Sequence, residues 1–278
     1  MSDTVVDQLR SSLGSFPATE RRVAMHLLSD YPMAGLSSAS ELARVVGVSA
    51  PTVLRLAARL GYGSYAEFQS QLRDELAAQL SSPLNKAPVE AEARAPADSW
   101  RAFAEAVIAN VRETFDHLAG AEIEQVTRLL ADPRLRVHLV GGRFTDALAR
   151  YLSVQLRILR PGVNHLQDQE ANWLDQLLDM GARDVLVLFD IRRYQPSLLR
   201  LAERAAARGT RVVLITDQWL SPVSKVARHV LPVRVAVPSV WDSNAALMAV
   251  GEALLAAVTR QMGERSRTRI ADLEKLRG

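Results

Sequence analysis

The stretch "GVSAPTVLRLAARLG", residues 47–61, carries side chains that could contact DNA. If Val53 and Leu56 face a protein core, a helix over this stretch turns small and basic residues outward. The outward candidates for DNA binding are Ser49, Ala50, Thr52, Arg55 and Arg59. Small groups at its start would let the helix enter the major groove, where Arg55 could reach guanine or a phosphate and Arg59 the phosphate backbone. The alternative is an amphipathic helix whose polar face is only solvated.

The residues around this helix favour DNA binding. Ala43 is small enough for two helices to cross closely, and Gly47 permits a left-handed turn between them. Ser49 suits the N-cap of the second helix, Pro51 suits its first turn, and Gly61 suits its end. We therefore predict a helix-turn-helix unit, with the second helix lying in the major groove of double-stranded DNA.

A second group of candidates lies in three loops that follow apolar runs: "GGRFTD" after "RVHLV", "DIRRYQP" after "DVLVLF", and "TDQWLSP" after "RVVLI". These loops supply the candidate ligand-binding residues Gly141, Gly142, Arg143, Thr145, Asp190, Arg192, Arg193, Tyr194, Thr216 and Ser221. Three arginines beside a helix N-terminus predict a small anionic ligand. The alternative is that Arg192 and Arg193 pair with Asp190, Glu203 or a partner subunit.

The remaining reactive side chains give little support to catalysis or metal binding. The chain has no cysteine, and the histidines at positions 26, 117, 138, 165 and 229 lack the spacing of zinc ligands. Phosphate-loop, dinucleotide and nucleophile-elbow motifs are absent. An isomerase would need a general base beside its substrate. The candidates Glu170, His165 and Glu252 are each explained more simply as a surface or capping residue of a helix. We therefore expect no metal, no cofactor and no enzymatic activity.

Two regions of different character must position these residues. Residues 1–80 are expected to form five short helices, two of them begun by the capping pairs Ser38/Glu41 and Ser64/Glu67. Residues 81–98 are rich in proline, alanine and charge, which suits an extended linker. From 99 to 278, continuous apolar runs alternate with helical segments, as in a parallel sheet covered on both faces. The predicted fold class is an all-α helix-turn-helix domain followed by a doubly wound, flavodoxin-like α/β domain.

The composition limits the class of protein. A chain of 278 residues is long enough for two domains or one large one, and 48% hydrophobic residues allow a sizeable core. The net charge of +3 is too small to argue for nucleic acid by itself, so the DNA prediction depends on local geometry. The N-terminus lacks a signal-peptide pattern, and no apolar run approaches the roughly 18 residues of a membrane span. We expect a soluble cytoplasmic protein.

Together these features resemble the RpiR/MurR family of bacterial transcription regulators. The resemblance is carried by "ATERRVAMHLLSDYP", "SASELARVVGVSAPTVLRLAARLGYGSYAEFQSQL", "VHLVGG", "DVLVLFD" and "VVLITDQWLSPVSKVARHVL". It implies an N-terminal helix-turn-helix domain and a C-terminal sugar isomerase (SIS) domain that senses a phosphorylated sugar without turning it over. It also implies a homodimer or homotetramer on palindromic operator DNA.

The binding loops depart from the pattern of that family, whose loops are rich in serine, threonine and glycine. Arg143 and Phe144 interrupt the first loop here, while Thr216 and Ser221 resemble the family's Thr…Ser-Pro loop and could line the same pocket. A hydroxyl-rich Ser-x-Ser-Gly run is replaced by Asp190, Arg192, Arg193 and Tyr194. We therefore expect an effector that is a sugar phosphate or a carboxylate. The alternative function is an SIS-type sugar-phosphate isomerase.

Overall fold

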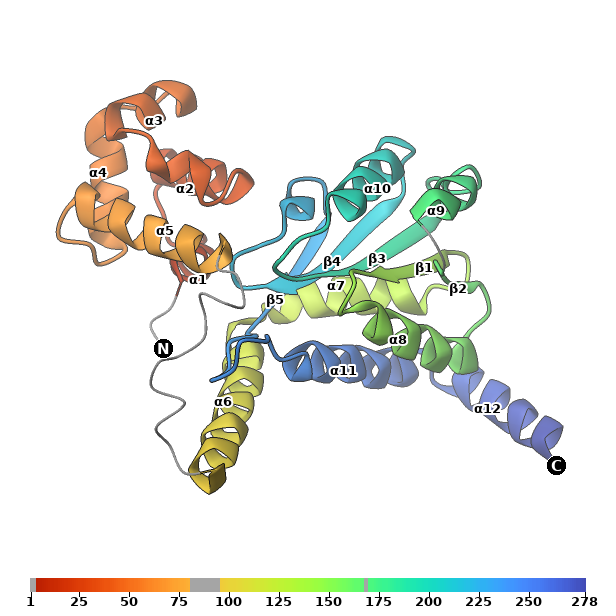
Figure 1. Ribbon diagram of the computed structural model, residues 1–278. Helices are drawn as coiled ribbons and strands as arrows, with labels where there is room; N and C mark the ends of the chain where they lie inside the picture. The colour runs from red at the N-terminus through yellow and green to blue at the C-terminus, as the bar shows by residue number, and fades with distance from the viewer. Residues whose placement is uncertain (1–3, 81–95, 168–169) are drawn as a thin grey trace. The chain divides into compact units, whose positions relative to one another are not determined.

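The computed structural model describes residues 4–80, 96–167 and 170–278, which divide into two units (Figure 1). Residues 1–86 make up most of the first unit and residues 87–278 most of the second. The predicted linker, 81–98, lies outside the described residues as far as position 95. Its last three positions are already helical, because α6 begins at Pro96.

The first unit contains five α-helices and a 3-10 helix among its described residues. They are α1 (Val5–Ser12), α2 (Ala18–Ser29), η1 (Met33–Leu36), α3 (Ala39–Val46), α4 (Ala50–Arg59) and α5 (Tyr65–Leu80). Each α-helix contributes buried apolar side chains to one core, among them Leu9, Val23, Leu42, Leu56 and Phe68. Burial of this apolar surface holds the short helices together, because such helices have little stability alone.

The α3–α4 turn has the predicted left-handed glycine. Gly47 has a φ of +73°, and its amide donates to Ala43 O at 2.9 Å. The Ser38 hydroxyl accepts from the Glu41 amide at 3.2 Å, as the capping pair predicts. Ser49 occupies the N-cap position of α4, but the prediction that its side chain caps the helix is wrong, because its Oγ lies 3.0 Å from Thr52 Oγ1 instead.

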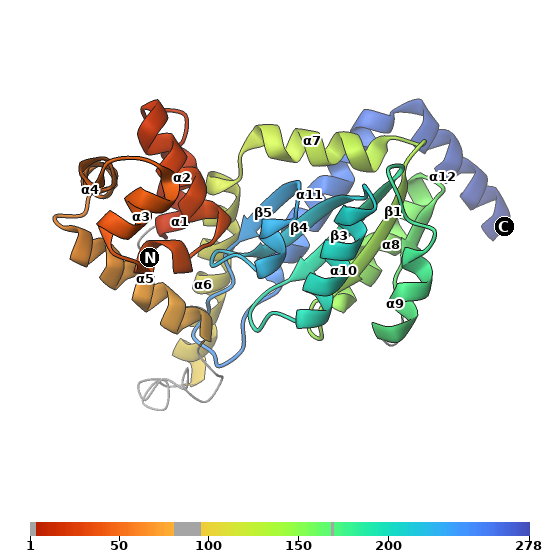
Figure 2. The same cartoon turned by 90° about the horizontal axis from the view of Figure 1, so that it is seen from above.

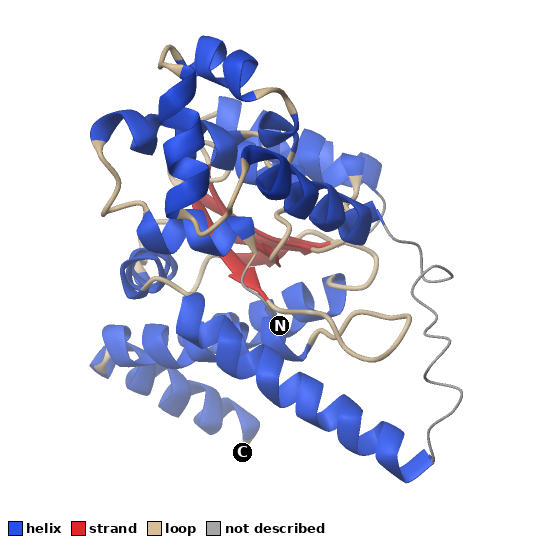
Figure 3. Ribbon diagram, turned by 90° about the vertical axis from the view of Figure 1, so that its left-hand side faces the viewer, coloured by secondary structure: helices blue, strands red, loops and turns tan. Residues whose placement is uncertain are grey.

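The second unit is built on one parallel sheet, shown in red in Figure 3. Its strands are β1 (Arg136–Gly141), β2 (Val163–His165), β3 (Asp184–Asp190), β4 (Arg211–Asp217) and β5 (His229–Val233). Their order is β2-β1-β3-β4-β5, and the register places Leu139 beside Val187 and Leu188 beside Leu214. The fold-class prediction is therefore confirmed. The order of the strands reverses between β1 and β3, where doubly wound folds hold their ligands.

Helices cover both faces of this sheet. They are α6 (Pro96–His117), α7 (Gly120–Ala131), α8 (Asp146–Leu159), α9 (Glu170–Leu177), α10 (Pro196–Ala207), η3 (Pro222–Lys225), α11 (Ala245–Met262) and α12 (Glu264–Arg277). In Figure 2, α10 lies in front of the sheet and α11 behind it. The strands are buried on both sides, which is why their sequences are continuously apolar rather than alternating.

Helix α11 differs from the sequence prediction, because it is long and apolar enough to cross a membrane by length and composition alone. One of its faces packs against α6, α7 and α8, and Leu247, Val250 and Leu254 on it are fully buried. A helix in the core of a globular unit passes the same composition test. We interpret α11 as a helix of the globular unit that is packed through this one face.

Candidate DNA-binding helix and effector pocket

Helix α4 buries Val53, Leu56 and Ala57 and exposes the opposite face. The residues exposed on α4 and at its N-cap are Ser49, Pro51, Leu54, Arg55, Ala58 and Arg59, and Ala50 is half-buried. The exposed face therefore contains three of the five predicted DNA contacts. Sequence reasoning missed Leu54, whose apolar side chain is 46% exposed in the middle of this face.

Thr52 does not lie on the exposed face, so the prediction of an outward threonine is wrong. Its side chain is 4% exposed, because position 52 falls almost directly above Leu56 on a helix of 3.6 residues per turn. Thr52 Oγ1 lies 3.0 Å from Ser49 Oγ and accepts from Arg55 Nη2 at 2.9 Å. It therefore supports two exposed side chains from beneath.

A buried carboxylate on α2 lies between the two arginines of α4. Glu20 is 3% exposed; its Oε2 accepts from Arg59 Nε at 2.9 Å, and its Oε1 lies 3.8 Å from Arg55 Nε. The pairing restricts the directions that both guanidinium groups can take. Helical periodicity within α4 could not reveal Glu20, because the acid lies 39 residues before Arg59 in the chain.

The loops after β1 and β3 meet at the carboxyl edge of the sheet, where the order of strands reverses. They enclose a pocket of about 410 Å³. Its lining residues are Gly142, Arg143, Phe144, Thr145, Asp190, Ile191, Arg192, Arg193, Gln195 and Trp241. Six of the ten predicted ligand-binding residues are among them. The other four, Gly141, Tyr194, Thr216 and Ser221, do not line the pocket.

Packing against the start of α8 requires the first glycine of this loop. A Cβ on Gly141 would lie 2.4 Å from the backbone nitrogen of Asp146, at the start of α8. A Cβ on Gly142 would lie 2.7 Å from Gln195 Oε1, the end of a flexible side chain that can move aside. At position 141, only glycine allows the strand and the next helix to approach this closely. Gly141 thus shapes the loop behind the pocket.

The three arginines of the pocket have different surroundings. Arg192 is 8% exposed and forms a fork with Asp242, through Nε to Oδ2 at 2.8 Å and Nη2 to Oδ1 at 2.6 Å. Ion pairing, the alternative left open by the sequence, therefore describes Arg192, although its acid is Asp242. Arg143 and Arg193 are exposed and form no ion pair with any residue that the structure describes.

Asp190 is a buried carboxylic acid that lines the pocket. Ser221 Oγ donates to its Oδ2 at 2.5 Å, and the Gln195 amide donates to its Oδ1 at 3.4 Å. Burial raises the pKa of Asp190 to about 7, and the charge of Asp217 adds to the rise. Thr216 Oγ1 accepts from the Ser221 amide at 3.0 Å, so both hydroxyl residues support Asp190 from outside the pocket.

An aromatic pair stands at the rim of the pocket. The ring centroids of Phe144 and Trp241 are 5.7 Å apart with an interplanar angle of 61°, and both side chains are more than half exposed. Asn244 Nδ2 donates to Phe144 O at 3.0 Å, which ties the first loop to the start of α11. Sequence reasoning missed Trp241 and Asp242. Their signal is topological, because in a parallel sheet the segment after β5 also leaves the carboxyl edge.

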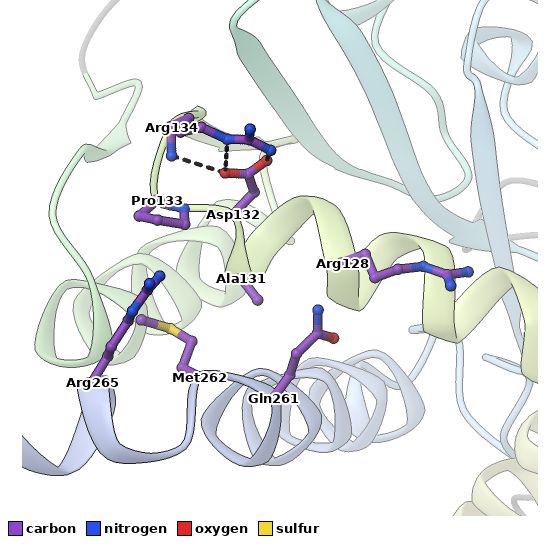
Figure 4. Close-up of a pocket in the computed structure, with 8 residues that line it drawn as sticks. All are labelled: Arg128, Ala131, Asp132, Pro133, Arg134, Gln261, Met262 and Arg265. Atoms are coloured by element: carbon purple, nitrogen blue, oxygen red, sulfur yellow. Dashed lines mark hydrogen bonds and ion pairs between the residues drawn. The ribbon is translucent and has the colours of Figure 1, made fainter.

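A larger cavity of about 730 Å³ lies between the end of α7 and the junction of α11 with α12 (Figure 4). Arg134 is turned back onto Asp132, with Nε to Oδ1 at 3.0 Å and Nη2 to Oδ2 at 2.8 Å. This fork lowers the pKa of Asp132 to about 2. Because residues 132–134 lead into the start of β1, the cavity lies at the amino edge of the sheet, away from the loops where ligands bind in this fold.

No group of three histidine, cysteine, aspartate or glutamate residues in the described part of the chain could hold a metal ion. Three histidines are instead paired singly with acids. One is His165, which lies on β2 and not on a helix as expected, with its Nε2 2.8 Å from Asp146 Oδ1. His138 Nε2 lies 2.9 Å from Asp184 Oδ1, which also accepts from Arg136, and His229 Nδ1 lies 2.9 Å from Glu122 Oε2. These pairs have the character of structural contacts rather than ligand sets.

The comparisons agree with both units. The model of the helix-turn-helix domain of the rpiR family matches residues 4–79, and that of the SIS domain matches residues 129–257. An HTH-type transcriptional regulator of Haemophilus influenzae is 25% identical, over 94% of this chain and 95% of that protein.

Two solved structures share the fold. The sugar isomerase domain of an RpiR transcription factor from Sphaerobacter thermophilus matches 63% of this chain and 97% of its own, with a TM-score of 0.58 at 24% identity. The Vibrio vulnificus NanR protein, complexed with ManNAc-6P, matches 98% of this chain and 97% of its own, with a TM-score of 0.56 at 16% identity. The chain belongs to the RpiR family of transcriptional regulators, which join a helix-turn-helix domain to an SIS domain.

Proposed function

We propose that the protein is a cytoplasmic transcription regulator that binds operator DNA through α4 and senses a small anionic metabolite in its SIS domain. The observation that carries the proposal is the presence, in one chain, of an exposed basic helix after a glycine turn and an arginine-lined pocket at the switch point of a parallel sheet. The HTH-type regulator of H. influenzae supports the first part, and the sugar phosphate held by V. vulnificus NanR supports the second.

In DNA binding, the exposed face of α4 enters the major groove. Ser49 and Ala50 are small, so the start of the helix approaches the bases closely. Arg55 contacts a base edge and Arg59, further along, contacts a phosphate. A homodimer or homotetramer would place two such helices on the halves of a palindromic operator.

In effector binding, Arg143 and Arg193 supply the positive charge that an anion requires, and Asp190 lines the same pocket. An effector changes DNA affinity only if it binds unequally to the DNA-binding and released arrangements of the oligomer. Loss of effector response in the Arg193→Ala protein, with DNA binding retained, would support this assignment. An unchanged effector response in this variant would show that Arg193 does not bind the effector.

A second candidate function is sugar-phosphate isomerisation, because Asp190 lines the pocket and its pKa of about 7 suits a general base. Both carboxylate oxygens of Asp190, however, already accept hydrogen bonds from Ser221 and the Gln195 amide. We therefore favour a sensor without enzymatic activity.

One experiment separates the two functions. The purified protein is mixed with DNA flanking its own gene in a gel shift, and separately with phosphosugars in a turnover assay. A specific shift that weakens with salt, without turnover, supports the regulator, because phosphate contacts release counterions. Turnover without any shift supports the isomerase.

A further inference from the structure

The donors that would cradle a phosphate in the first loop are already used within the protein. The Gly142 amide donates to Phe189 O at 3.0 Å and to Thr145 Oγ1 at 2.8 Å. The Arg143 amide donates to Gln195 Oε1 at 2.5 Å, and the Thr145 hydroxyl donates to Phe189 O at 2.6 Å. A ligand phosphate would therefore compete with internal hydrogen bonds at each of these groups.

The polar groups of the second loop are committed in the same way. The Ser221 hydroxyl donates to Asp190, and the Tyr194 hydroxyl donates to Asp217 Oδ1 at 2.7 Å. The Arg192 fork is occupied by Asp242. Helix α10 begins with Pro196, which has no N–H to offer an anion. The second loop, like the first, lacks the cluster of uncommitted hydroxyls and amides that a phosphate needs.

The charged donors of the pocket that remain are two guanidinium groups, one from each loop. Arg143 and Arg193 both line the pocket and both are exposed. Neither forms an ion pair within the described part of the chain. A guanidinium fork matches the two coplanar oxygens of a carboxylate with two parallel hydrogen bonds, so one arginine can satisfy one carboxylate. A phosphate can use the same forks, but it would also need the loop amides and hydroxyls that are already paired within the protein. Two such arginines without those donors therefore suit a ligand with two carboxylates.

The apolar part of the pocket suits a flat ligand. Phe144 and Trp241 are 56% and 57% exposed at the rim, so both residues are accessible to a ligand. The guanidinium carbon of Arg143 lies over the Phe144 ring, 5.3 Å from its centroid, so a cation already lies beside this aromatic face. A ligand with a planar body can extend this arrangement.

We propose that the effector is a small flat dicarboxylate, with an aromatic or conjugated body, rather than a phosphorylated sugar. Arg143 and Arg193 each bind one carboxylate, and the body packs against Phe144 and Trp241, face-on to one ring and towards the edge of the other. The proposal rests on the effector pocket of the proposed function and names the class of its ligand.

Calorimetric titration of the full-length protein tests the proposal with named probes. Isophthalate is the flat diacid, and glutarate is its flexible counterpart with the same number of carbons between the carboxylates. Glucose 6-phosphate and inorganic phosphate represent the other class. We expect isophthalate to bind at least about tenfold more tightly than the other three, because it alone combines two forks with stacking.

Variants assign the contacts. Arg143→Ala and Arg193→Ala should each weaken isophthalate binding by about tenfold or more, because each removes a charge-assisted fork. Trp241→Ala should weaken isophthalate but leave glutarate unchanged. Arg200→Ala is the matched control, because Arg200 is an exposed arginine of α10 that pairs with Glu170 at 3.9 Å and does not line the pocket.

The proposal is overturned if glucose 6-phosphate binds as tightly as isophthalate, if isophthalate does not bind, or if Arg200→Ala weakens it as much as Arg193→Ala. A gel shift on the same preparations distinguishes failure of this ligand proposal from failure of the proposed function. Operator DNA that is bound but released by a sugar phosphate refutes only the ligand class. A protein that binds no operator refutes the regulator itself.

Discussion

Arg59 donates a hydrogen bond from Nε to Glu20 Oε2 over 2.9 Å, so a buried acid of α2 fixes the direction of a side chain on the exposed face of α4. Arg55 approaches the other oxygen of the same carboxylate at 3.8 Å. The helix proposed to contact DNA is therefore oriented by a partner outside the helix-turn-helix pair. Glu20 also cancels part of the positive charge on that face, which gives it two separable effects on DNA binding.

Glu20→Gln should raise non-specific affinity and lower the preference for the operator. The substitution removes one negative charge beside two arginines, so the salt dependence of binding should steepen by up to about one phosphate contact. The arginines also lose their charged anchor and with it their fixed direction. Fluorescence anisotropy with operator and scrambled duplexes at several salt concentrations measures both effects. An unchanged operator preference would show that Glu20 does not orient these side chains for DNA.

The two arginines of α4 should differ when each is replaced by alanine. Arg55→Ala should relax discrimination at one base pair by about 1–3 kcal/mol, because it removes a base contact. Arg59→Ala should weaken all sequences alike and reduce the salt slope by about one, because it removes a phosphate contact. Measuring the binding of both variants to operators substituted at one position at a time distinguishes a base contact from a phosphate contact. Equal losses on every sequence with Arg55→Ala would assign this residue to the backbone as well.

The Arg192–Asp242 pair should be important for stability. Asp242→Ala leaves a guanidinium that is 8% exposed without its fork partner, which should lower the free energy of unfolding by about 3–5 kcal/mol. The control is Asp132→Ala, which breaks a fork to Arg134, whose side chain is 85% exposed; this should cost less than about 1 kcal/mol. Urea unfolding of the three proteins gives the comparison. Similar losses in both variants would contradict the distinction.

Asp190 should make both stability and anion binding depend on pH. Burial raises the pKa of Asp190 from 3.8 to about 7, so the folded protein holds a proton that the unfolded chain releases. The resulting stability is present below about pH 4 and is lost as the pH rises to 7. Asp190→Asn should remove this slope. Above pH 7, the ionised carboxylate should also weaken anion binding. Parallel stability profiles for the two proteins between pH 4 and 8 would refute the assignment.

Two glycines should respond oppositely to alanine. Gly141→Ala forces a Cβ to within 2.4 Å of the Asp146 backbone, which should destabilise the protein by about 1–3 kcal/mol through overpacking. Gly251→Ala, within α11, meets no atom within 4 Å and should stabilise the protein by roughly 0.5–1 kcal/mol, because alanine favours helix. Thermal unfolding measures both. If Gly141→Ala is tolerated, the loop does not require glycine.

The fold followed from local patterns, whereas the pairing of side chains did not. Apolar runs located the strands, and the parallel topology placed the loops after β1 and β3 at one edge. The hydroxyl of Thr52 predicts a surface position, but its helical position lies above Leu56, and burial follows the helical position rather than the polarity of the side chain. Asp242 was missed as the partner of Arg192 because 50 residues separate them. Periodicity has no information about contacts at that separation.

The contact between Gln195 and the Gly142 loop should weaken the binding of common inorganic anions to the ligand-free protein. The side-chain carbonyl of Gln195 accepts from the Arg143 amide at 2.5 Å, so the loop is satisfied by a neutral group of the chain itself. Chloride, free phosphate or an abundant phosphate ester would have to displace this carbonyl before it could accept a hydrogen bond from the Arg143 amide. An internal acceptor of this kind reduces the response of an anion-binding pocket to anions that are common in solution but are not its ligand.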